Sequence, residues 1–291
     1  MSWIFFTILA AFMQTWRNAL QSKLSKDVDT SGVTLARFLF AAPIAALYLY
    51  ILYQFTPQHL PEFSAGFIRF VFIASVMQII ATSLMVVLFK QKNFAIGAGL
   101  AKSEALVAGV LGTLFFGSQL TLLGWAGIFV GTLSIFVLSG LLQKGNCSLK
   151  TVFIGLACGS SFALTSLYVR EASHELNLPL LHAAGWVLLL VISIQTLMLS
   201  VYIAIKNPRV FHQLRQHPKL TIATSITSCI GSVGWFTAMA LQHVAYVKTL
   251  GQIEVLFTIV LSIFWLKQPV KKHEVWGLTL ISLAAIMVMW G

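Results

Sequence analysis

Two glutamates of this 291-residue sequence lie inside long apolar runs, where a carboxylate is costly. Glu104 comes ten residues after Phe94, near the start of one run, and Glu254 comes ten residues after Val244, at the start of another. Ten helical residues rise about 15 Å, so both side chains are expected near the middle of a membrane-spanning helix. A charge at that depth costs roughly 3 kcal/mol and normally faces a protein interior or a water-filled cavity. The two glutamates are therefore the first candidates for a binding site.

The two glutamates also match each other when the chain is aligned with itself. A shift of 150 residues pairs 95–140 with 245–290 and places Glu104 on Glu254, although the sequence has only eight acidic residues. Each carboxyl group could carry a proton or stay charged as the counterion of an amine, depending on its surroundings. The alternative is structural, an ion pair with Lys102 or Lys248 that locks two helices together.

Basic and amide side chains accompany both glutamates. Lys102 is two residues from Glu104, about 200° around a helix, so its partner must come from another helix. Lys248 and Gln252 are four residues apart and share a helix face, which predicts a donor patch for an anionic or zwitterionic group. Lys248 is also one turn from the expected start of its helix, so snorkelling to the membrane surface stays open.

Three further polar side chains are candidates because of their depth. Arg17 and Arg37 lie one to two turns inside their apolar runs, with Gln14 and Asn18 on the first of them. They could line a polar vestibule, or each arginine could snorkel to lipid headgroups. Gln78, in the middle of the third run, has no such route to water and is expected to line a cavity or to bind a neighbouring helix.

Aromatic and small residues complete the candidate set. Trp235 and Tyr168 could flank a central cavity and contact a cation or a ring through their faces. The spacings of Gly127 with Gly131, and of Gly155 with Gly159, predict close helix packing within one subunit or between two.

Nothing in the sequence indicates a metal site, a cofactor or an enzyme. The three cysteines form no CxxC motif and no metal-binding spacing with histidine. The histidines fall in or beside predicted loops, and no HExxH, GxSxG, phosphate-binding loop or GxGxxG motif is present. We therefore expect no catalytic residue, no metal and no cofactor.

The composition excludes a soluble protein. The chain is 58% hydrophobic and 9% charged, whereas about a quarter of the residues of a soluble domain are charged. A net charge of +11 could indicate a nucleic-acid-binding protein, but the Lys and Arg residues stand at the ends of apolar runs and form no basic stripe. The expected partner is the lipid bilayer and not a nucleic acid.

The apolar runs are close to the roughly 20 residues that cross a bilayer, and they predict an all-α membrane protein with ten transmembrane helices. The expected helices are 3–22, 32–53, 65–89, 94–116, 121–142, 149–169, 180–205, 219–242, 244–266 and 273–290.

Loop charges predict how these helices cross the membrane. Connections after odd-numbered helices carry most of the Lys and Arg, while the other side has Arg170 and, close by, Arg69. Because basic loops stay in the cytoplasm, both termini are expected outside it. The connections of the second half repeat those of the first with the opposite charge bias, which predicts two inverted five-helix repeats, 1–145 and 146–291.

This pattern resembles the drug/metabolite transporter superfamily, specifically its EamA-like branch. The resemblance is carried by the stretch LVAGVLGTLFFGSQLTLLGWAGIFVGTLSIFVL and its copy VLFTIVLSIFWLKQPVKKHEVWGLTLISLAAIMV, and it covers nearly the whole chain. The chain departs from the family pattern at Ala105 and Val255, where a proline commonly follows the glutamate, and at Ser118 and Gln268, which replace an acid in the following loop. The resemblance implies an exporter or exchanger of amino acids and other small metabolites in the plasma (inner) membrane.

The expected mechanism is alternating access around a central site between the third, fourth, eighth and ninth helices. A secondary transporter of amino acids or organic amines is the favoured function, coupled to a proton or a counter-substrate, in a monomer or homodimer. A passive channel or facilitator and a non-transporting membrane scaffold remain as alternatives.

Overall fold

A computed structural model of the protein describes residues 2–90, 101–138, 149–257, 260 and 272–290. The regular elements in these ranges are helices, as expected. They are α1 (Ser2–Leu24), α2 (Thr30–Ala36), α3 (Ala41–Phe55), α4 (Ala65–Phe89), α6 (Glu104–Phe115), α7 (Leu122–Leu138), α8 (Leu149–Glu175), α9 (Leu180–Lys206), α10 (Arg209–Gln216), α11 (Pro218–Leu241), α12 (Val244–Leu250), the 3₁₀ turn η1 (Gly251–Ile253) and α14 (Lys272–Trp290).

Five segments of the described chain are long and apolar enough to cross a membrane: Thr30–Phe55, Ala65–Phe89, Leu149–Glu175, Leu180–Lys206 and Pro218–Leu241. They coincide with five of the ten expected helices. The expected helices 94–116, 121–142 and 244–266 lie partly outside the described residues. The fold is thus an all-helical membrane bundle with these spans.

The expected helix 32–53 is interrupted at residues 37–40, between α2 and α3. Pro43 has no amide hydrogen for the Leu39 carbonyl and crowds it, which disfavours a continuous helix here. Ser225 of α11 satisfies the opened backbone, since its hydroxyl donates to the Ala36 carbonyl (2.6 Å) and accepts from the Phe40 amide (3.2 Å). The break places Arg37 in the interior of the bundle.

The helix α10 was not expected, because its eight residues fall within a polar connection. Pro208 precedes it and Pro218 begins α11, so the chain turns at both of its ends. Val210 and Leu214 are buried against α2, where they lie close to Gly32.

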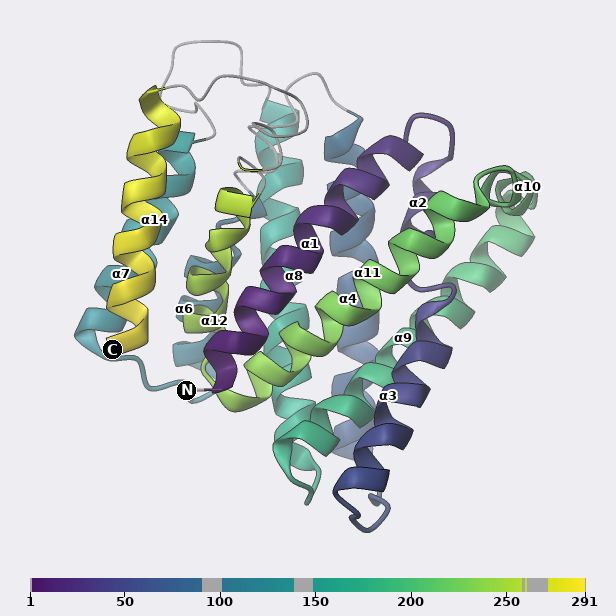
Figure 1. The fold of residues 1–291 in the computed structure, drawn as a ribbon, viewed down its shortest axis with the longest axis horizontal. Coiled ribbons are helices and arrows are strands. Elements are labelled where there is room, and N and C mark those ends of the chain that lie inside the picture. The colour runs from purple at the N-terminus through teal and green to yellow at the C-terminus, as the bar shows by residue number, and fades with distance from the viewer. Residues whose placement is uncertain (1, 91–100, 139–148, 258–259, 261–271, 291) are drawn as a thin grey trace.

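Three helix pairs dominate the packing: α1 with α11, α4 with α8, and α7 with α14. Figure 1 shows α1 and α11 crossing the front of the bundle and α7 beside α14 at its left edge. Glycines allow the close approaches, since a Cβ at Gly234 would lie 2.7 Å from the Phe6 carbonyl and one at Gly127 would lie 2.8 Å from Val288. The predicted packing role of Gly127 is therefore confirmed within one subunit.

The bundle has apolar side chains outside and many hydroxyl and amide groups inside. Large exposed residues include Phe5, Phe129 and Leu197, each about two-thirds exposed, whereas Ser75, Gln195 and many other polar side chains are buried. A membrane protein has this distribution because lipid solvates the outer face while polar groups bind one another within.

Candidate functional site

The helices that carry the two glutamates are irregular just before each of them. Lys102 and Ser103 form a turn that precedes Glu104 and α6, and the 3₁₀ turn η1 precedes Glu254. A short stretch that leaves α-helical geometry redirects the side chains around it. Gly159 of α8 makes room for the first irregularity, because a Cβ there would lie 2.7 Å from the Ala101 carbonyl.

Glu254 is bound by residues of α1 and of the turn before α6. Its carboxylate forms an ion pair with Lys102. Gln14 and Asn18, one helical turn apart on α1, donate from their amide nitrogens to its two oxygens at 2.6 and 2.7 Å. Lys102 thus pairs with a glutamate from a distant segment of the chain and not with Glu104, as their two-residue spacing predicted.

Glu104, in the first half of the chain, pairs with a lysine of the second half, the reverse of the Lys102–Glu254 pair. Its carboxylate lies 3.5 Å from the ammonium group of Lys248, and this ammonium also lies 4.4 Å from the ring centre of Trp235. The Trp235 indole donates to the Gln14 side chain at 2.9 Å. Hydrogen bonds, ion pairs and a cation–π contact thus link both glutamates through α1, α11 and α12.

Arg17 and Arg37 do not snorkel. Both side chains are buried, with exposed fractions of 5% and 3%. Arg17 donates to the side-chain oxygen of Asn18 (2.9 Å), while Arg37 donates to Ser228 of α11 (3.1 Å) and Thr82 of α4 (2.7 Å). The snorkelling alternative is therefore wrong. Arg17 points inward from α1, and Arg37 points inward from the break between α2 and α3, so that both guanidinium groups face away from lipid.

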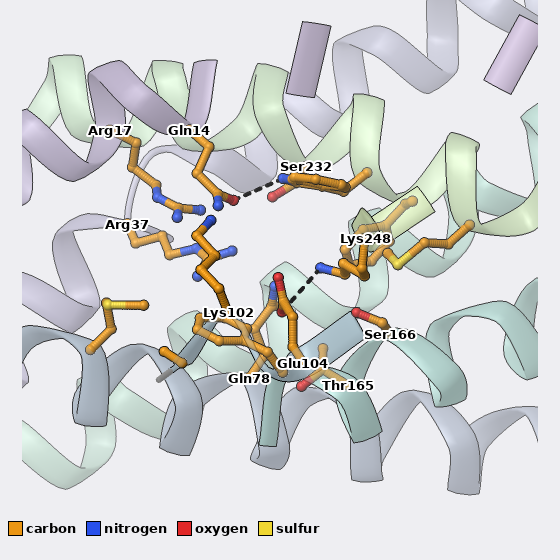
Figure 2. A pocket seen from close by; sticks show the side chains of 16 residues that line it. Gln14, Arg17, Arg37, Gln78, Lys102, Glu104, Thr165, Ser166, Ser232 and Lys248 are labelled. Carbon is orange, nitrogen blue, oxygen red and sulfur yellow. Dashed lines mark hydrogen bonds and ion pairs between the residues drawn. The ribbon is translucent and has the colours of Figure 1, made fainter. Parts of the chain in front are cut away.

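Five of these charged side chains line one small cavity, into which they point from several segments of the chain (Figure 2): Arg17, Arg37, Lys102, Glu104 and Lys248. Its volume is about 30 Å³, enough for roughly two water molecules and too small for a metabolite. The site is therefore closed. The lining residues are Gln14, Arg17, Arg37, Gln78, Met85, Ala101, Lys102, Glu104, Phe162, Thr165, Ser166, Ser232, Trp235, Phe236, Met239 and Lys248.

Most sequence-predicted residues line this cavity, and three do not. Glu254 lies outside the lining but is ion-paired with Lys102, which is part of it. Gln252 is buried beside Gly131, outside the cavity lining. The 3₁₀ turn winds more tightly than an α-helix and removes the face that Gln252 was expected to share with Lys248. Tyr168 also lies outside the lining, with its ring against Phe70 and Phe116.

The structure adds polar residues that the sequence did not single out. Thr165, Ser166 and Ser232 line the cavity, and the buried amide of Gln195 donates to the side-chain oxygen of Gln78 at 2.7 Å. Hydroxyl and amide residues are common in membrane helices, so sequence alone could not separate these from packing residues.

Comparison with known proteins gives a family match and a similar solved structure. The model of the EamA-like transporter family matches residues 149–290. A crystal structure described only as that of a protein is similar over 96% of this chain and 98% of that chain, with a TM-score of 0.68 and 14% sequence identity. No curated protein sequence matches the chain.

The structural likeness concerns the fold alone, because the identity is low. The family match shows the class of function, because EamA-like proteins are membrane transporters and not enzymes. It confirms the predicted protein class and leaves the substrate open. The second half of the chain, residues 149–290, therefore belongs to the EamA-like transporter family of the drug/metabolite transporter superfamily.

Proposed function

We propose that the protein is a secondary transporter, an exporter or exchanger of small metabolites, that works by alternating access around Glu104 and Glu254. The observation that carries the proposal is the pair of crossed ion pairs, Lys102 with Glu254 and Glu104 with Lys248. Each joins a residue of 1–145 to a residue of 146–291. Contacts that join two parts of a carrier at its closed site can be exchanged for contacts with a solute.

The proposed architecture has ten membrane spans in two inverted repeats, 1–145 and 146–291. Two observations support it. The packing is reciprocal, because α1 of the first part pairs with α11 of the second while α4 of the first pairs with α8 of the second. In addition, a helix irregularity precedes each of the two aligned glutamates.

In the proposed cycle, the two parts rock about the cavity and open it to one side at a time. A solute that enters must compete with the ion pairs for their charged groups, and a proton or a counter-solute can do the same from the other side. Loop charges support termini outside the cytoplasm of an inner membrane. The functional unit would be a monomer or a homodimer.

Glutamate substitution in proteoliposomes tests the proposal. A panel of labelled amino acids, amines and organic acids first identifies a transported solute. Glu104→Gln and Glu254→Gln should then each lower its uptake at least about tenfold, because a lost charge-assisted contact is worth about 1.5–3 kcal/mol. Glu62→Gln, at an exposed loop position, should transport normally.

The rival functions predict different results. A channel or facilitator would only let the solute equilibrate, and no gradient of protons or of a second solute would drive its accumulation. A scaffold would move no member of the panel. Normal uptake by both glutamate variants would remove Glu104 and Glu254 from the mechanism.

A further inference from the structure

The charges around the cavity do not balance. Arg17, Arg37, Lys102 and Lys248 bring four positive charges to the cavity, and Glu104 and Glu254 bring two negative ones through their ion pairs with the lysines. Neither arginine forms an ion pair with a carboxylate among the described residues, although Arg17 is attracted by Glu254 and Glu104 from a longer distance. Buried charges are costly unless they are paired, so this excess needs an explanation.

No other acidic side chain that the structure describes lines the cavity or pairs with either arginine. Apart from the two glutamates, the acidic residues lie in connections or in the terminal turns of helices, and the sequence segments outside the described ranges contain none. These residues are Asp27, Asp29, Glu62, Glu171, Glu175 and Glu274. The described side chains therefore leave the excess positive charge uncompensated, which points to a negative charge supplied from outside the chain.

Both arginines also have hydrogen-bond donors to spare. A guanidinium group has five N–H donors. Arg17 uses two of them on Asn18, and Arg37 uses two on Ser228 and Thr82. The remaining donors have no acceptor among the described residues, and both side chains line the same face of the cavity in Figure 2.

The planar fork of a guanidinium group matches the paired oxygens of a carboxylate or a phosphate. The rest of the cavity offers apolar surface from Met85, Phe162 and Met239. We infer that the transported solute is a small organic anion whose carboxylate or phosphate group binds between Arg17 and Arg37. This inference rests on the proposed transport function and replaces the amine or amino acid that the sequence favoured as its substrate.

Ligand-dependent thermal stability of the purified full-length protein tests the charge class. The probes are succinate, glycerol 3-phosphate, alanine and putrescine at millimolar concentration and constant ionic strength. Succinate or glycerol 3-phosphate should raise Tm by several degrees, because a ligand that binds only the folded state stabilises it. Alanine and putrescine should not.

Arginine variants then locate the binding group. Arg17→Gln should weaken the anion effect at least about tenfold, since it removes a charged hydrogen-bonding group. Arg69→Gln is the matched control, because Arg69 is exposed and lies outside the cavity lining, and it should behave as the unmodified protein. Arg17→Lys keeps the charge but loses the planar fork, and it should also weaken the rise in Tm caused by the anions. Because its buried charge is retained, a weaker rise in this variant cannot be attributed to a misfolded protein.

The unliganded Arg17→Gln protein should be at least as stable as the unmodified protein, because it loses a buried charge that has no carboxylate partner. Stabilisation by putrescine or alanine alone, no effect of either anion, or equal anion effects in Arg17→Gln would each overturn the inference. Uptake into proteoliposomes separates the two proposals. Accumulation of putrescine in place of the anions would keep the transporter and refute the anionic substrate, whereas anion binding without accumulation would refute transport.

Discussion

Glu104 and Glu254 occupy aligned positions in the sequence but differ in how they are bound. Glu254 accepts hydrogen bonds from Gln14 and Asn18 in addition to its ion pair with Lys102. The ion pair of Glu104 with Lys248 is longer, at 3.5 Å. The Glu104 pair is therefore expected to open first when a solute enters.

A double-mutant cycle measures the Lys102–Glu254 pair. Lys102→Met should lower the free energy of unfolding by about 3 kcal/mol, because it leaves a buried carboxylate without its cation. Adding Glu254→Gln should recover part of this loss, with a coupling energy of about 1–3 kcal/mol. Thermal unfolding in detergent gives the energies, and the exposed Lys150→Met serves as the control. Strictly additive losses would mean that the pair does not contribute to stability.

At the residue scale, the sequence predicted which charged side chains lie inside the bundle better than which residues they contact. A charge in an apolar run is visible without coordinates, and so Glu104, Glu254, Lys102 and Arg17 could be singled out. Their partners depend on helices that are distant in the chain. The inward orientation of the two arginines depends on tertiary packing, so the sequence left it open between a polar vestibule and snorkelling.

At the scale of the helix, Arg170 connects α8 to the end of α11. Its guanidinium group donates to the backbone carbonyls of Met239 and Gln242, both at 2.7 Å. The last carbonyls of a helix lack intrahelical partners and carry partial negative charge, so a cation stabilises them. The contact fixes the point where the chain leaves α11 and turns into α12, which carries Lys248.

Arg170→Gln should therefore lower the free energy of unfolding by about 1.5–3 kcal/mol, the usual contribution of hydrogen bonds from a charged donor. Thermal unfolding in detergent measures it, and Arg69→Gln is again the matched control. An unchanged Tm for Arg170→Gln would show that water caps this helix end equally well.

Hydropathy predicted where most elements lie but not where they break. The bounds of α4, α9 and α11 agree with expectation to within about a residue because lipid thickness sets their length. The break before α3 was foreseeable from Pro43. The turn at η1 contains no proline that would have predicted it. It packs closely against Trp235, since a Cβ at Gly251 would lie 2.3 Å from the indole.

At the scale of the whole molecule, α1 begins and α14 ends at the same end of the bundle (Figure 1). The connection between α3 and α4 lies toward that end, while α10 lies toward the opposite one. The ends can therefore be distinguished by residues that are exposed in the structure, and the proposed orientation assigns α10 to the cytoplasm.

Labelling of single cysteines in intact cells tests that orientation. In a protein whose native cysteines are replaced, His59→Cys should react with a membrane-impermeant maleimide, because residue 59 is exposed in the connection after α3. Gln216→Cys, exposed at the end of α10, should react only after the cells are permeabilised. The opposite pattern would place both termini in the cytoplasm.

The crossed ion pairs also bear on the protein without cargo. Two lysines and two glutamates already neutralise one another across the closed site, and separating them in a poorly polarisable interior costs several kcal/mol per ion. An empty carrier of this kind would reorient slowly, and a loaded one would reorient faster because the cargo replaces the lost contacts. A carrier of this kind favours the exchange of one solute for another. It loses little of a solute gradient when solute is present on only one side of the membrane.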